Sequence, residues 1–96
     1  MNKYELVIVV DPKLNKENEA SINTDMDNKI KEYGKILDKD DKGIKKLAYE
    51  VKKNKEARYI IYLFEVPNSK NIDAIREIER FCRIRDEILK FITVKQ

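Results

Sequence analysis

The segment from Arg58 to Val66, which reads RYIIYLFEV, constrains the fold of this chain more than any other. It consists almost entirely of β-branched, aromatic and other large apolar residues, and Pro67-Asn68-Ser69 follows it at once. A composition of this kind, closed by turn-forming residues, is typical of a β-strand. We therefore predict a strand over residues 58–66, and the remaining elements have to be placed around it.

Three further segments have strand character. Residues 4–10 form a β-branched run that ends at Asp11-Pro12, and because both of its faces are largely apolar we expect a central strand. Residues 36–51 have a weaker pattern, interrupted by charges and by a glycine, as expected of an edge strand that avoids unwanted pairing. The polar tract 52–55 is expected to be a turn. Residues 88–94 are again rich in β-branched and aromatic side chains and predict the last strand.

Two segments have the period of an amphipathic helix. In the first, a polar start at residues 15–17 and an expected left-handed stop at Gly34 enclose apolar residues spaced by four, four and three positions: Ile22, Met26, Ile30 and Tyr33. In the second, one helical face is apolar and the others are charged. That apolar face consists of Ile72, Ile75, Ile78 and Cys82.

The resulting order is strand, helix, strand, strand, helix, strand, which predicts one α+β domain over residues 1–96 with a ferredoxin-like split βαβ fold (βαββαβ). Its four-stranded antiparallel sheet should carry both helices on one face. We expect the apolar faces of the elements to form the core: Leu6, Ile8, Val10, Ile22, Met26, Ile30, Ile60, Tyr62, Phe64, Val66, Ile75, Ile78 and Cys82. The other face should carry exposed apolar residues that await a neighbour, among them Val7, Val9 and Ile61.

The composition excludes several kinds of chemistry. There is no histidine, cysteine occurs once, and the two glycines at 34 and 43 cannot form a phosphate-binding loop. We expect no cofactor, no metal, no small-molecule substrate and no catalysis. No apolar run approaches the roughly 20 residues that span a bilayer, so we expect a cytosolic protein without a membrane role. Carboxylate groups such as Asp25/Asp27, Asp38/Asp40/Asp41 and Asp86/Glu87 are expected to be solvated or to protect a sheet edge.

Charge is unevenly distributed along the chain. Residues 1–41 carry seven basic and ten acidic side chains, a net charge of −3, whereas residues 42–96 carry fourteen basic and eight acidic ones, a net charge of +6. The overall net charge of +3 would not by itself point to nucleic acid. The distribution places the basic surface in the second part of the chain.

Residues 43–52, GIKKLAYEVK, resemble the signature of the small-subunit ribosomal protein six family, in which a glycine, a basic residue and Leu-Ala-Tyr recur. Val51 stands where the family usually has isoleucine, and Lys46 where it often has an acidic, amide or arginine side chain. The second helix looks about one turn longer than in some relatives, and the resemblance ends at Gln96, without the extended tail found in many of them. Further matching segments run along the whole chain: Lys3-Tyr4-Glu5, Asp11-Pro12, Tyr33-Gly34 and Arg83-Ile84-Arg85-Asp86.

The resemblance implies a ferredoxin-like protein that binds the central domain of small-subunit ribosomal RNA beside ribosomal protein eighteen, in a ribosome of the cytoplasm or of an organelle. It implies RNA-side roles for Lys3, Tyr4, Arg83 and Arg85. Three more residues are candidates because they are basic and adjoin the matching motifs: Lys45, Lys46 and Lys90. Lysine and arginine neutralise phosphate charge, and tyrosine can stack on an unpaired base.

Each of these assignments has a structural alternative. Arg83 and Arg85 could instead form salt bridges with Glu79, Asp86 or Glu87. Tyr4 could simply extend the core, because it shares strand parity with Leu6. Lone lysines such as Lys45 and Lys46 are, without the resemblance, more often solvated side chains.

Two other functions fit the same fold. An acyl-phosphatase-like enzyme would need a phosphate-binding loop after the first strand, but residues 11–15 contain no glycine and begin with an acid. The other alternative is a protein-interaction or ligand-sensing module with the same fold. Because a ribosomal protein of this family is also expected to have a protein partner, only RNA binding distinguishes the two.

Overall fold

Strands and helices follow one another in the predicted order in the computed structural model, which describes residues 2–51 and 53–96. The elements in this part of the chain are β1 (Asn2–Val10), α1 (Lys16–Tyr33), β2 (Lys35–Val51), β3 (Asn54–Val66), the short 3₁₀ helix η1 (Asn68–Lys70), α2 (Asn71–Ile84) and β4 (Ile88–Lys95). The side chain of Asn15 caps α1 by accepting a hydrogen bond of 2.8 Å from the backbone N–H of Asn18. The polar start expected there is confirmed.

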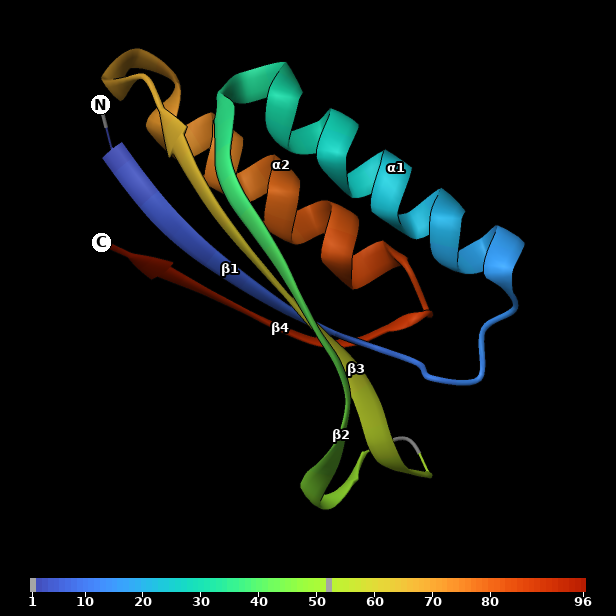
Figure 1. The fold of residues 1–96 in the computed structure, drawn as a ribbon. Coiled ribbons are helices and arrows are strands. Elements are labelled where there is room, and N and C mark those ends of the chain that lie inside the picture. The colour runs from blue at the N-terminus through green and yellow to red at the C-terminus, as the bar shows by residue number, and fades with distance from the viewer. Residues whose placement is uncertain (1, 52) are drawn as a thin grey trace.

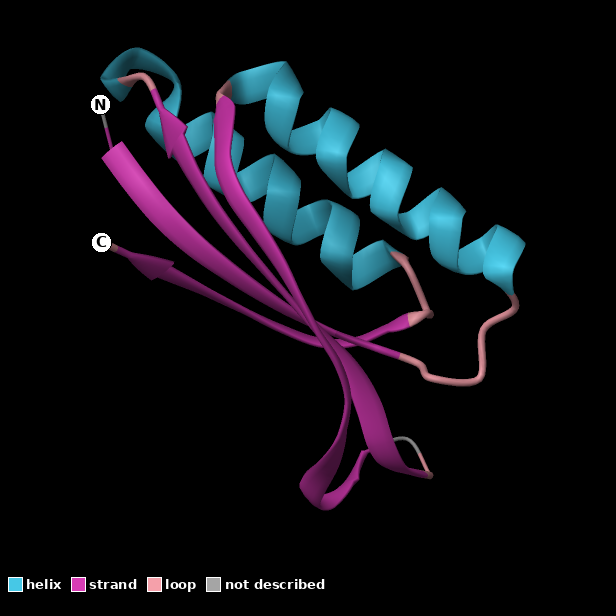
Figure 2. Ribbon diagram, viewed as in Figure 1, coloured by secondary structure: helices cyan, strands magenta, loops and turns pink. Residues whose placement is uncertain are grey.

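The strands form one antiparallel sheet in the order β2-β3-β1-β4. Both helices lie on the same face of the sheet, and the opposite face carries no helix (Figures 1 and 2). The ferredoxin-like prediction is therefore confirmed, together with the central position of β1 and the edge position of β2.

Strand β3 begins at Asn54, four residues earlier than predicted. The expected turn at 52–55 is therefore wrong for residues 54 and 55, while Lys52 lies outside the described residues. Asn54 is polar but still pairs with β2, opposite Val51. Because β1 pairs with β3 only as far as Arg58, the ends of β2 and β3 extend beyond the sheet as a two-stranded projection (Figure 1). We call residues 44–50 and 54–57 the arm.

The predicted core is buried between the sheet and the helices, with one exception. Ile75 packs against the core but is only partly buried, because it faces the open side of α2. Tyr4, Ala74 and Ile88 belong to the core in addition, and the Tyr4 ring stacks on Phe64 with centroids 5.8 Å apart. The even positions of 60–66 face the helices, so the predicted register is confirmed.

The other face of the sheet is less exposed than expected. Val7 and Ile61 are half-buried, but Val9 is buried, and its expected exposure is wrong. Val9 lines a small cavity of about 150 Å³ with Tyr59 and with Leu47, Ala48 and Tyr49 of the arm. The arm therefore covers one end of this face, which no local pattern in the sequence reveals.

Gly34 ends α1, but not through a left-handed conformation. Its backbone is extended, at φ −162° and ψ −150°, which any residue can adopt. The reason for glycine is a close approach: a Cβ atom here would overlap the backbone carbonyl oxygen of Glu65 in β3. Gly43 is the left-handed glycine, at φ +76°, and it lies where the register between β2 and β3 shifts.

Charged side chains attach α1 to the sheet. Asp27 accepts a hydrogen bond of 2.8 Å from the Tyr62 hydroxyl and one of 3.2 Å from Lys39 Nζ. Burial and this carboxylate raise the pKa of Tyr62. Arg58 pairs with Glu19 at 3.1 Å and with Asp41 at 2.8 Å. Several of the carboxylates expected to be solvated are thus structural partners of cations.

Replacing Gly34 by alanine should destabilise the protein by about 1–3 kcal/mol, because the backbone of Glu65 has to move away from the new methyl group. Denaturant unfolding of this variant gives the free energy directly. Gly43→Asn is the matched control, since nothing lies within 4 Å of a Cβ there and asparagine tolerates positive φ. Equal stability of Gly34→Ala and the wild type would contradict the close approach.

Burial raises the pKa of the Cys82 thiol from 9.0 to about 12. The folded state thus keeps its proton at a pH where the unfolded state loses it. The contribution of this thiol to the free energy of unfolding should be constant below about pH 9 and should fall as the pH rises towards 12, by up to about 1.4 kcal/mol per pH unit. Urea unfolding at several pH values should show a shallower alkaline loss for Cys82→Ala. Equal losses in the two proteins would show that the thiol ionises as readily when folded.

Candidate nucleic-acid interface

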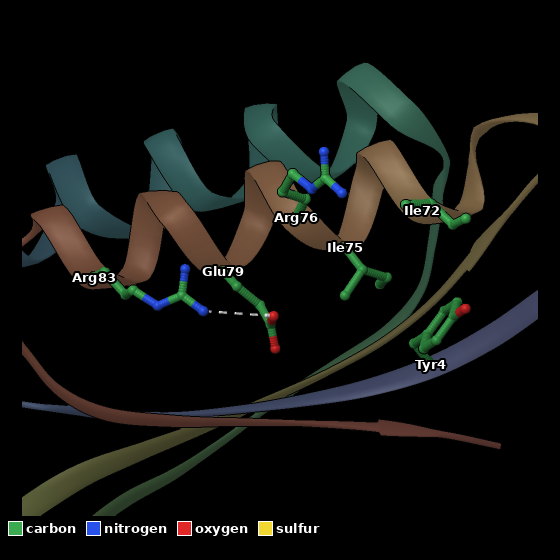
Figure 3. Close-up of a pocket in the computed structure, with 6 residues that line it drawn as sticks. All are labelled: Tyr4, Ile72, Ile75, Arg76, Glu79 and Arg83. Carbon is green, nitrogen blue, oxygen red and sulfur yellow. Dashed lines mark ion pairs between the residues drawn. The ribbon is translucent and has the colours of Figure 1, made fainter.

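Two of the predicted RNA-side residues, Tyr4 and Arg83, line the same groove. The groove has a volume of about 540 Å³ and lies between α2 and the start of β1 (Figure 3). Tyr4 comes from β1, and α2 supplies the other lining residues: Ile72, Ile75, Arg76, Glu79 and Arg83. Four of these lie on one stripe of the helix, because positions 72, 76, 79 and 83 follow its period.

Arg83 is held only loosely. Its side chain is 62% exposed, and its Nη2 atom is 3.9 Å from Glu79 Oε1, at the limit of an ion pair. The guanidinium also lies 5.8 Å from the ring centroid of Phe91 in β4. An exposed pair of this kind contributes roughly 0–1 kcal/mol, so the guanidinium can exchange Glu79 for a phosphate at little cost.

Arg85 has a different environment, although it is only two residues away. Its side chain is 22% exposed, and its Nη1 atom lies 2.8 Å from Asp25 Oδ2 in α1. The Nε atom is 3.5 Å from Glu87, and the guanidinium is 5.5 Å from the ring centroid of Phe81. The hydrogen bond with Asp25 is the main reason why the pKa of Arg85 is raised. The structure thus places Arg85 outside the groove.

The lysines lie on other surfaces. Lys3 has the opposite strand parity to Tyr4, so its side chain belongs to the face without helices. In the sheet it pairs with Glu65 of the neighbouring strand β3. Lys90 pairs in register with Val9 on that same face and lines the cavity beneath the arm. Lys45 and Lys46 belong to the arm, and Lys46 lines a hollow there with Tyr49 and Lys55. The candidates therefore divide between the groove, the helix-free face and the arm.

Tyr4 extends the core, and its RNA-side role stays a prediction. Its ring is buried against Phe64, as the structural alternative held, yet the side chain also contributes to the floor of the groove (Figure 3). A ring packed in this way offers little surface on which a base could stack.

Arg76 is the groove residue that sequence reasoning did not single out. It is exposed and makes no ion pair with any residue in the described ranges. Its spacing of seven from Arg83 places both arginines on one helical face, and this spacing is the sequence signal that could have identified it. Two arginines on either side of Glu79, next to Tyr4 and two isoleucines, suit a phosphate chain whose sugars or bases contact the apolar residues.

Other site types find no support in residues 2–51 and 53–96. No group of three or more cysteine or carboxylate residues there could hold a metal ion. No helix in this part of the chain is long and apolar enough to cross a membrane.

Comparison with known proteins provides independent evidence for the family to which the chain belongs. The family model described as Ribosomal protein S6 matches residues 3–95. A small ribosomal subunit protein bS6 from Desulfatibacillum aliphaticivorans is 41% identical over 96 residues, which are 99% of this chain and 50% of that relative. The bS6 of Sulfurovum sp. (strain NBC37-1) is also 41% identical and is covered to 72%, and that of Caldanaerobacter subterraneus is 33% identical and is covered to 97%. The chain thus spans only half of the first relative's length.

The fold has a close match among solved structures. The crystal structure of 30S ribosomal protein S6 from Thermotoga maritima superposes with a TM-score of 0.85 at 28% sequence identity. The match covers 99% of this chain and 87% of the other. The two structures therefore agree over the whole sheet and both helices.

Proposed function

Because this chain belongs to the ribosomal protein S6 family, we propose that it is a structural constituent of the small ribosomal subunit and binds the central domain of its ribosomal RNA together with ribosomal protein eighteen. The observation that carries the RNA part of the proposal is the groove, where exposed Arg76 and loosely paired Arg83 lie on one helical face. The role needs no catalysis and no cofactor, since binding alone orders the RNA. Its place of action is the cytoplasmic or organellar ribosome.

In the proposed complex the RNA backbone runs along α2. Arg83 leaves its 3.9 Å contact with Glu79 for a phosphate, and the planar guanidinium can donate two parallel hydrogen bonds to phosphate oxygens. Arg76 lies two helical turns away and binds a neighbouring phosphate. Ile72, one turn before Arg76, is largely exposed and offers an apolar surface to a sugar or base beside that phosphate.

The arm provides a second basic surface. Lys45 and Lys46 are exposed and make no ion pair within the described ranges, whereas Lys39 and Lys42 of the same strand are paired with Asp27 and Asp40. Lys46 lies opposite Glu56 in the β2–β3 register, and the three lysines and two glutamates of the arm leave it a net charge of +1. Unpaired lysines at this position support additional phosphate contacts.

The partner protein is proposed to cover the helix-free face of the sheet. Ile92 and Val94 of β4 are about half exposed there, next to half-buried Val7 and Ile61. Apolar side chains in one patch on an open sheet are typical of an interaction surface. An interaction module without RNA binding would use the same patch, so only RNA affinity separates the two functions.

Replacing Arg83 by alanine should weaken binding to a transcript of the central domain by about 1–3 kcal/mol and lower the salt dependence by about one phosphate contact. Arg80→Ala is the matched control. It lies on the same helix, is 70% exposed and is also 3.9 Å from a glutamate, but it does not line the groove. Titrations at several salt concentrations measure both quantities.

If the two variants have equal affinity and equal salt slopes, the groove is not the RNA site.

Co-purification before and after RNase treatment tests the wider proposal. Association with ribosomal particles that disappears with the RNA supports it, whereas lasting association with one non-ribosomal protein supports the interaction module.

Replacing Ile92 by aspartate should abolish most binding of ribosomal protein eighteen, because a carboxylate would be buried without a partner in the interface. The affinity of the isolated variant for RNA should change much less than that of Arg83→Ala. Thr24→Asp adds the same charge at an exposed position of α1 and is the control. Calorimetric titration with the partner would contradict the surface assignment if both variants bound equally well.

A further inference from the structure

We propose that Arg85 is a positioning residue: it fastens the turn between α2 and β4 to α1, and thereby sets Arg83 and the groove, without contacting RNA itself. The inference rests on the proposed RNA binding. It also separates two arginines of one short basic segment that the sequence alone treats alike.

The contacts of Arg85 come from three elements. Asp25 belongs to α1 and accepts a hydrogen bond of 2.8 Å from Nη1, while Glu87 lies 3.5 Å from Nε in the turn itself. The ring of Phe81, in the last turn of α2, lies 5.5 Å from the guanidinium. One side chain thus joins the end of α2, the turn and the middle of α1.

The same turn is joined to the sheet by backbone hydrogen bonds. The carbonyl oxygen of Glu87 accepts a bond of 2.9 Å from the N–H of Asp11, just after β1. The N–H of Ile88 donates a bond of 3.1 Å to the carbonyl oxygen of Arg85, and the Ile88 side chain is buried in the core. Arg85 therefore lies at the point from which β4 enters the sheet.

The position of β4 matters for the groove because Phe91 belongs to this strand. The Arg83 guanidinium lies 5.8 Å from the Phe91 ring centroid, so Arg83 is held between the end of α2 and β4. If the turn loosens, α2 and β4 are no longer fixed relative to one another, and Arg83 loses its preferred orientation.

A direct RNA contact by Arg85 would cost more than one by Arg83. Arg85 would have to leave a short charge-assisted hydrogen bond to Asp25 and the contact with Glu87, and two carboxylates would be left beside the RNA. Arg83 gives up a single contact of 3.9 Å in a far more exposed position. The phosphate contact is therefore assigned to Arg83, and the attachment of the turn to α1 is assigned to Arg85.

Asp25→Ala separates positioning from direct contact, because the two roles predict effects of opposite sign. The substitution removes a negative charge and releases Arg85, so a direct phosphate contact would become stronger. Under the positioning role, Asp25→Ala and Arg85→Gln should both weaken binding to the central-domain transcript, by roughly 2- to 30-fold. Neither should lower the salt slope as Arg83→Ala does, and the double variant should be no weaker than the worse single one.

Arg85→Lys separates the effect of the positive charge at position 85 from that of the guanidinium shape. Lysine keeps the positive charge but lacks the planar fork that faces Asp25 and Glu87 together, so it should rescue binding only in part. Full rescue by lysine, a reduced salt slope for Arg85→Gln, or tighter binding by Asp25→Ala would overturn the proposal and make Arg85 an RNA contact.

Amide hydrogen exchange of the free protein provides a readout without RNA. In Asp25→Ala and Arg85→Gln the N–H groups of Ile88 and Asp11 should exchange faster, while those of Leu6 and Ile60 in the central strands should be unchanged. Unchanged exchange at Ile88 and Asp11 would show that Arg85 does not hold the turn. If the wild-type protein binds no such transcript, the proposed function fails, and the exchange rates still decide whether Arg85 holds the turn.

Discussion

The packing of the even-numbered side chains of residues 4–10 in β1 and 60–66 in β3 against the apolar faces of α1 and α2 is the interaction on which the rest of the structure depends. These side chains are almost completely removed from water, and each large one contributes about 1.5–3 kcal/mol of transfer free energy. Because side chains alternate along a strand, this burial also fixes the register of the sheet and leaves the odd-numbered residues on the other face. The groove follows from the same packing, since Tyr4 at the end of the buried row meets the open side of α2.

Charged residues make up 41% of the chain, and their roles differ with their surroundings rather than with their type. Asp27, Arg58 and Arg85 are partly buried and attach α1 to the sheet or to the turn before β4. Arg76 and Arg83, by contrast, are exposed and have weak partners or none among the residues that the structure describes. A fold with a thin core thus uses part of its charge for internal attachment and leaves the remainder exposed to solvent.

The arm shows how one element can serve both the fold and an external surface. Its strands continue the pairing of β2 and β3 beyond the sheet, and Leu47, Ala48 and Tyr49 line the cavity that buries Val9. The lysines of the same segment remain exposed. The Leu-Ala-Tyr part of the family signature therefore has a packing reason, while the adjoining lysines have none.

The sequence by itself determined the order of the elements, the central and edge positions of β1 and β2, and nearly the whole core. It could do so because burial acts on every second residue of a strand and on one stripe of a helix, and both periods are visible in the chain. It could not determine the extent of the arm, the burial of Val9 or the reason for glycine at position 34, since each depends on a segment distant in sequence. Arg83 and Arg85 are the clearest case: they are equivalent in the sequence, and only the tertiary structure decides between them, because Asp25 approaches one of the two from a helix sixty residues away.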